Sequence, residues 1–156
     1  IVHVSSGAAF GIAGMSVYGA VKMSLIGLTR AQALEGDPLG IKVNVIAPYA
    51  SVRGNGFGGI PWSPALAEWL SPEQVAPLTL LLAHESCPST GEWFTVGGGH
   101  VSRVAVAVHD GFGHRPLTAE VLAEHWGEVL GSEEAYRVEP TGGSTAVRSM
   151  FRGYAG

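Results

Sequence analysis

Residues 1–47 read IVHVSSGAAFGIAGMSVYGAVKMSLIGLTRAQALEGDPLGIKVNVIA, and they contain a strand, a helix and a second strand in that order. The β-branched Val2 and Val4 favour a strand at the start. Apolar side chains then recur at helical spacing between residues 17 and 34. The run at 41–47 is again typical of a strand. Two strands joined by a helix form a βαβ unit, so the sequence predicts an α/β fold with parallel strands.

The rest of the chain is expected to add helices and further strands around this unit. Ser16 is expected to be the N-cap of the first helix, because a serine hydroxyl can accept from an unpaired helical N–H. Working outward, the sequence predicts a Gly- and Pro-rich loop at 51–64, a short helix at 64–70, a helix at 71–84 kinked at Pro77, a strand at 92–96, a strand or extended arm at 101–108, and a helix at 119–130 capped by Thr118. No firm pattern is found from residue 133 onward.

The composition excludes several classes of protein. The 156 residues are 46% hydrophobic and 14% charged, which argues against a disordered chain. Apolar runs are too short to span a bilayer, and a net charge of -4 gives no reason to expect nucleic acid or an anionic membrane as partner. Cys87 is the only cysteine, which fits a reducing compartment, so a cytoplasmic location is expected.

Metal binding is not expected. The six histidines have no HExxH spacing or comparable ligand pattern. The lone Cys87 is interpreted as a small packing residue rather than a nucleophile.

Tyr18 and Lys22 are the first candidate site residues. They stand four positions apart on the predicted helix, so their side chains share one face. A nearby ammonium favours the phenolate form of a phenol, and such a pair can pass a proton to or from a substrate oxygen. Ser6 ends the first strand, where ligands meet open α/β sheets, and its hydroxyl could bind the same oxygen. A Tyr and a Lys at this spacing also occur by chance, so the pair needs its context.

That context resembles the short-chain dehydrogenase/reductase family. The matching stretches, in the family's order within residues 1–99, are IVHVSSGAAFG, SVYGAVKMSLIGLTRAQALEG, GIKVNVIAPYAS and STGEWFTVGGG. The resemblance implies the C-terminal part of a Rossmann-type parallel sheet with flanking helices. It also implies a secondary alcohol–ketone oxidoreductase that uses NAD or NADP, with NAD favoured.

The resemblance also implies roles for single residues. Tyr18 is implied to be the acid/base, and Lys22 is implied to hold the nicotinamide ribose as well. The active serine is implied to be Ser6, because the family's serine commonly precedes a small residue. The family's usual gap of 13 residues instead fits Ser5 (18 − 5), since Ser6 gives 12 (18 − 6).

The segment after the second strand is implied to lie along the nicotinamide, where its backbone groups can bind the carboxamide. This cofactor-binding segment is Pro48, Tyr49, Ala50 and Ser51. The family usually has Pro-Gly here, so Tyr49 is a departure.

A larger departure is the missing cofactor-binding half. The family's glycine-rich turn belongs to an earlier βα unit, and the GGG at 97–99 opens no helix. The chain also begins inside a strand without a Met. We therefore expect residues 1–99 to be the C-terminal half of a dehydrogenase domain and residues 100–156 to be an extension with a helix, inactive as an isolated fragment.

Residues 97–130 resemble one group of enzymes within the family. GGGHVSRVAVAVHDGFGHRPLTAEVLAEHWGEVL at 97–130 is similar to the end of the dehydrogenase module of peroxisomal multifunctional β-oxidation enzymes, although its arm is apolar rather than basic. This implies oxidation of (3R)-3-hydroxyacyl-CoA to 3-ketoacyl-CoA. The expected partners are a small-molecule substrate such as an acyl-CoA and, at full length, further copies in a homodimer or homotetramer.

Two alternatives stay open. A different substrate within the family would make the protein a 3-ketoacyl-carrier-protein reductase or a steroid dehydrogenase. A chain without its cofactor-binding half could instead be catalytically silent, either as a truncated product or as a packing and dimerisation module.

Overall fold

The structure, a computed structural model, describes residues 1–51, 63–131 and 136–138. The chain forms two compact units, residues 1–104 and residues 105–156. The glycine-rich loop predicted at 51–64 falls largely outside the described residues. No helix within the described ranges is long and apolar enough to cross a membrane.

A four-stranded sheet organises the first unit, in the order β1-β2-β3-β4. Its strands are β1 (Val2–Val4), β2 (Asn44–Pro48), β3 (Trp93–Gly97) and β4 (His100–Val104). β1, β2 and β3 are parallel, and β4 returns antiparallel to β3. The predicted α/β fold with a mainly parallel sheet is confirmed.

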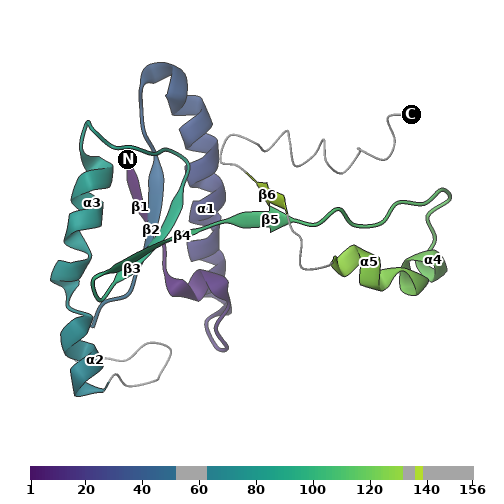
Figure 1. Cartoon of the computed structure of the whole chain (residues 1–156), viewed down its shortest axis with the longest axis horizontal. Helices are drawn as coiled ribbons and strands as arrows, with labels where there is room; N and C mark the ends of the chain where they lie inside the picture. The colour runs from purple at the N-terminus through teal and green to yellow at the C-terminus, as the bar shows by residue number, and fades with distance from the viewer. Residues whose placement is uncertain (52–62, 132–135, 139–156) are drawn as a thin grey trace. The chain divides into compact units, whose positions relative to one another are not determined.

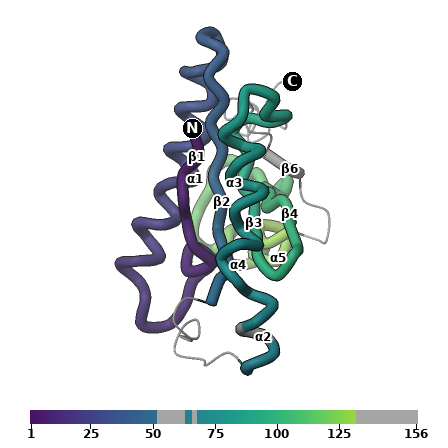
Figure 2. Tube along the Cα trace, turned by 90° about the vertical axis from the view of Figure 1, so that its left-hand side faces the viewer, coloured from purple at the N-terminus to yellow at the C-terminus, as the bar shows by residue number. Residues whose placement is uncertain are grey.

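Helices cover both faces of this sheet. The long α1 (Ser16–Gly36) lies on one face and α3 (Ala76–Ala83) lies on the other (Figure 1, Figure 2). Side chains alternate between the faces along each strand. Val45 and Trp93 therefore pack towards α1 with Ile26. Ile46 and Val96 point to the other face and cluster with Leu82 of α3 and with Cys87.

The first helix begins one residue earlier than predicted. Ser16 is the first helical residue, and Met15 is the N-cap, without a side-chain hydrogen bond. The predicted N-cap role of Ser16 is therefore wrong. The helix instead gains its N-terminal contact from the preceding 3₁₀ turn η1 (Gly7–Phe10), on which it packs. It ends at Gly36, where a Cβ would lie 3.0 Å from the Ile41 carbonyl oxygen, and a second 3₁₀ turn, η2 (Asp37–Leu39), follows.

The helix predicted at 71–84 is two elements. A 3₁₀ turn, η3 (Pro72–Gln74), precedes α3, and Pro77 lies in the first turn of α3 rather than at a kink. The N–H groups in the first turn of a helix have no acceptor within the helix. A proline, which has no N–H, is therefore tolerated there. The short helix predicted before it is confirmed as α2 (Pro64–Trp69).

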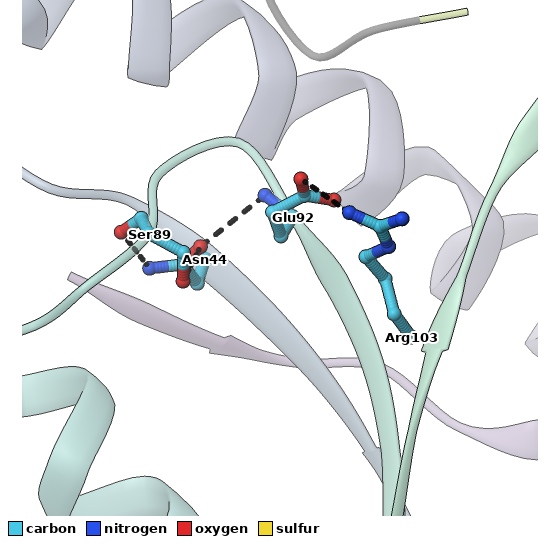
Figure 3. Close-up of polar contacts among 4 residues, drawn as sticks. All are labelled: Asn44, Ser89, Glu92 and Arg103. Atoms are coloured by element: carbon cyan, nitrogen blue, oxygen red, sulfur yellow. Dashed lines mark hydrogen bonds and ion pairs between the residues drawn. The ribbon is translucent and has the colours of Figure 1, made fainter. Parts of the chain in front are cut away.

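A fully buried asparagine fixes the start of the second strand, which was predicted at 41–47 and begins at Asn44. The Asn44 Nδ2 donates to the Ser89 carbonyl (2.8 Å), and its Oδ1 accepts from the Glu92 N–H (3.2 Å), as Figure 3 shows. Glu92 also forms a partly exposed ion pair with Arg103 of β4 (3.6 Å). These contacts bind the segment before β3 to the start of β2.

The described part of the second unit contains a two-stranded ribbon and two short helices. β5 (Val106–Val108) pairs antiparallel with β6 (Tyr136–Val138), a strand that the sequence did not predict. The helix predicted at 119–130 is divided at His125 into α4 (Ala119–Glu124) and α5 (Trp126–Leu130). Thr118 caps α4 as predicted, accepting from the Val121 N–H.

Candidate active site

The candidate site lies where the parallel strands β1 and β2 end. In an open α/β sheet, this carboxyl edge is the usual place for a ligand. Ser5 and Ser6 follow β1, and Tyr49, Ala50 and Ser51 follow the last residue of β2, Pro48. The Ser5 N–H donates to the Ile46 carbonyl (2.7 Å), which continues the strand pairing up to the site.

Two reciprocal hydrogen bonds bind α1 to the end of β1. The Lys22 Nζ donates to the Val4 carbonyl (2.9 Å), and the Ser5 Oγ donates to the Lys22 carbonyl (2.8 Å). The Lys22 side chain is thereby held at the carboxyl edge of the sheet. An ammonium carries three donors, and Val4 is its single acceptor within the described part of the chain, so two N–H groups remain for a ligand.

Tyr18 lies one turn before Lys22, as the predicted spacing requires. The Lys22 Nζ is 5.6 Å from the centroid of the Tyr18 ring. The Tyr18 side chain is about half exposed (48%), and its hydroxyl has no hydrogen-bond partner within the described ranges. The structure therefore brings Tyr18 and Lys22 together and leaves the phenol open to a substrate.

The turn that carries Ser6 packs directly against the start of α1. A Cβ added at Gly19 would lie 2.8 Å from the Ala8 carbonyl oxygen, so only glycine permits this approach. Gly19 is next to Tyr18 in sequence, and Ala8 is two residues after Ser6. The close contact thus places the serine turn beside the helix that carries Tyr18 and Lys22.

The two serines differ in what their hydroxyls do. The Ser5 hydroxyl is buried and donates to Lys22, as described above. The Ser6 Oγ accepts from the Ala8 N–H (3.2 Å) and caps the turn, and its own O–H meets no acceptor among the described residues. The Ser6 O–H therefore remains available to donate to a substrate oxygen, whereas the Ser5 O–H is used in its hydrogen bond to the Lys22 carbonyl.

Tyr49 has a feature that the sequence interpretation missed. Residues 48–51 were expected to act through their backbone, but the Tyr49 ring lies against Gly7. A Cβ at Gly7 would be 2.8 Å from the Tyr49 Oη. The sequence did contain a signal for this contact, because Tyr49 stands where the family usually has a glycine after the proline.

One apolar pocket of about 510 Å³ lies near the site but on another side of α1. It is lined by Ala8, Ala9, Gly11, Ile12, Ala13, Met15, Ser16, Gly19, Ala20 and Met23. Residues 19, 20 and 23 point about 100° to 200° around the helix from Tyr18. The pocket is therefore separate from the Tyr18 and Lys22 face.

Part of a nicotinamide cofactor fits the described residues. The two remaining Lys22 N–H groups suit the hydroxyls of a ribose, and the exposed Tyr18 stands one helical turn away. The backbone after Pro48 ends beside them. A pyrophosphate is typically bound by a glycine turn that joins a strand directly to a helix, and the described residues contain no such turn.

Comparison with known proteins gives consistent matches. Residues 1–52 match the family described as short chain dehydrogenase. A Mycobacterium tuberculosis protein named as a short-chain type dehydrogenase/reductase is 37% identical over 130 residues, covering 83% of this chain and 44% of the relative. Peroxisomal multifunctional enzyme A of Dictyostelium discoideum is 35% identical over 130 residues, covering 83% of this chain and 29% of the relative.

A solved structure extends the likeness to the fold. The full-length peroxisomal multifunctional enzyme type 2 of Drosophila melanogaster superposes with a TM-score of 0.80 and 26% identity. The match covers 95% of this chain and 27% of that one. The chain thus spans less than half the length of each of these relatives.

Proposed function

Because this chain belongs to the short-chain dehydrogenase/reductase family, we propose that it carries the proton-transfer residues of an oxidoreductase that interconverts a secondary alcohol and a ketone. The observation that supports this most is the open Tyr18 phenol on one face of α1 with Lys22, whose Nζ is bound to Val4 at the carboxyl edge. Residues 1–99 are the C-terminal half of the dehydrogenase domain, and residues 100–156 extend it.

The chemistry assigned to the chain is a proton transfer. In the oxidative direction Tyr18 takes the proton of the substrate hydroxyl, and in the reductive direction it returns a proton to the carbonyl oxygen. The Lys22 ammonium stabilises the negative charge on the phenolate through space, and Ser6 donates a hydrogen bond to the same substrate oxygen. A bound NAD or NADP supplies the hydride acceptor or donor, and NAD is favoured.

The tail supports a particular substrate class. A match of 130 residues in a chain of 156 must include residues 27–130, so the likeness to the Dictyostelium enzyme runs past the dehydrogenase strands into the extension. We propose (3R)-3-hydroxyacyl-CoA as the substrate and 3-ketoacyl-CoA as the product. A carrier-protein-bound or steroid substrate and a silent chain are the competing outcomes, and the predicted cytoplasmic location and dimer or tetramer stay predictions.

The test is the activity of Tyr18→Phe in the full-length protein. Wild type should reduce NAD with a (3R)-3-hydroxyacyl-CoA and not with the 3S isomer, and Tyr18→Phe should lower kcat at least about 100-fold. The variant should keep the wild-type Tm, since the half-exposed hydroxyl makes no bond in the described structure. Turnover close to wild type in Tyr18→Phe would exclude Tyr18 as the acid/base, and an inactive wild type would support the silent chain.

A further inference from the structure

The ring of Tyr49 lies on the residue that follows Ser6. A Cβ at Gly7 would be 2.8 Å from the Tyr49 Oη, 3.0 Å from its Cε1 and 3.1 Å from its Cζ. Gly7 itself is buried, whereas Tyr49 is only partly buried. The phenol end of Tyr49 therefore reaches from the end of β2 to the serine turn at the end of β1.

The backbone of Tyr49 is fixed tightly at this place. Its N–H donates to the Val96 carbonyl (2.7 Å) and continues the pairing of β2 with β3. On the other side its carbonyl oxygen lies so close to Gly97 that any Cβ there would collide with it. Since the backbone cannot shift towards β3, the side chain has a defined origin from which its ring projects over Gly7.

We propose that Tyr49 is a specificity-determining residue, whose ring forms one wall of the substrate site beside the Ser6 hydroxyl. This rests on the proposed function, since Ser6 marks the place of the substrate oxygen. With a glycine at position 49, the space over Gly7 would be open. With Tyr49, that side accepts a slender, unbranched chain and excludes a branched or ring-bearing one.

Replacing Tyr49 should change which substrates are used. Tyr49→Gly and Tyr49→Phe would be compared with wild type in the full-length protein, using an unbranched and a branched 3-hydroxyacyl-CoA. The ratio of kcat/KM for the branched over the unbranched substrate should rise at least about tenfold in Tyr49→Gly, because the ring fills more than one methylene's volume. Tyr49→Phe keeps the ring, so it should keep the wild-type ratio.

A second substitution tests the contact itself. In Gly7→Ala, the new Cβ must displace the Tyr49 ring, which is the movable end of a side chain, so the substrate ratio should shift. In Gly7→Ala/Tyr49→Gly the three atoms nearest to the new Cβ are removed, so the ratio should equal that of Tyr49→Gly. Gly27→Ala is the matched control, because a Cβ at Gly27 contacts nothing and the ratio should stay at the wild-type value.

The outcomes separate this inference from the proposed function. If wild type oxidises the unbranched substrate and Tyr49→Gly keeps the wild-type ratio, the wall is disproved while the oxidoreductase assignment stands. A fall in Tm without a change in ratio would likewise disprove it, because it would make Tyr49 a packing residue only. If wild type has no activity on either substrate, the proposed function fails first.

Discussion

Ser5 and Ser6 are adjacent in sequence, but their side chains contact different parts of the molecule. Ser5 donates to a carbonyl of α1, whereas Ser6 caps its own turn and keeps its O–H unused among the described residues. The spacing to Tyr18 favoured Ser5 and the sequence context favoured Ser6. The hydrogen bonds support Ser6, which stays a prediction until the two are compared.

Ser6→Ala should lower kcat more than Ser5→Ala in the full-length protein. Ser6→Ala removes the donor proposed for the substrate oxygen, a loss of about 100-fold by analogy with removal of one oxyanion donor. Ser5→Ala should instead lower the free energy of unfolding by about 1 kcal/mol, because it removes a partly buried hydrogen bond to α1. Steady-state kinetics and urea unfolding of both variants measure this, and equal kcat for Ser6→Ala and wild type would reverse the assignment.

Two glycines of α1 provide a matched comparison. Gly19→Ala must move α1 away from the Ala8 carbonyl, since the new Cβ would lie 2.8 Å from that oxygen. We expect a loss of about 1–3 kcal/mol in stability together with a fall in kcat, because Tyr18 moves with the helix. Gly27→Ala, open on all sides, should gain about 0.5–1 kcal/mol from helix propensity.

Thermal unfolding and kinetics of the two alanine variants give the result. A Gly19→Ala protein as stable and active as wild type would show that the contact between α1 and the serine turn does not position Tyr18.

At the level of elements, apolar periodicity predicted the βαβ unit, and the exact ends depended on tertiary contacts. The strand at 41–47 begins at Asn44, because the pairing with Val2 starts there. Local sequence could not show that η1 packs against α1, or that Ser16 is the first helical residue rather than the N-cap. It also could not show β6, since that strand depends on a distant partner, β5.

The cap of α4 was predicted from sequence and gives a pH-dependent expectation. A backbone hydrogen bond, and then one with the Thr118 side chain, hold the pKa of Glu120 below its ordinary value. A carboxyl with a lowered pKa stabilises the folded state above its ordinary pKa, and this contribution is lost as pH falls through the lowered value. Thr118→Ala should destabilise α4 by about 1 kcal/mol and weaken this acid sensitivity.

Hydrogen exchange at the α4 amides, measured at neutral pH and near pH 4, is the suitable readout. Ser86→Ala in the first unit serves as a control that leaves α4 unchanged. Exchange in Thr118→Ala equal to wild type at both pH values would contradict the role of the cap.

For the whole molecule, the family could be predicted from the sequence, and so could the placement of Tyr18 beside Lys22 on one helix face, whereas the active site itself stays a prediction. The contact between the Tyr49 ring and Gly7 could not, because it joins residues that follow two different strands. The boundary between the two units after Val104 could not be predicted either. It depends on the antiparallel pairing of β4 with β3, and the turn residues at 97–99 allow this pairing without requiring it.

The isolated 156-residue chain should bind NAD weakly. The residues proposed for the nicotinamide end are present, whereas the described residues have no glycine turn that joins a strand directly to a helix for the pyrophosphate. Calorimetric titration should show no saturable binding at micromolar NAD, with the full-length protein as the positive control. Micromolar binding by the isolated chain would contradict the assignment of residues 1–99 as half of the cofactor domain.

The register of the sheet also has a consequence for the order of folding. Gly97 pairs with His100 across a tight hairpin, whereas Val2 pairs with Asn44, 42 residues away (44 − 2), and Val45 with Trp93, 48 away (93 − 45). Local pairs close faster than distant ones. The β3–β4 hairpin should therefore form early and the two parallel pairings late, so burial of Trp93 against Val45 and Ile26 should accompany the return of activity during refolding.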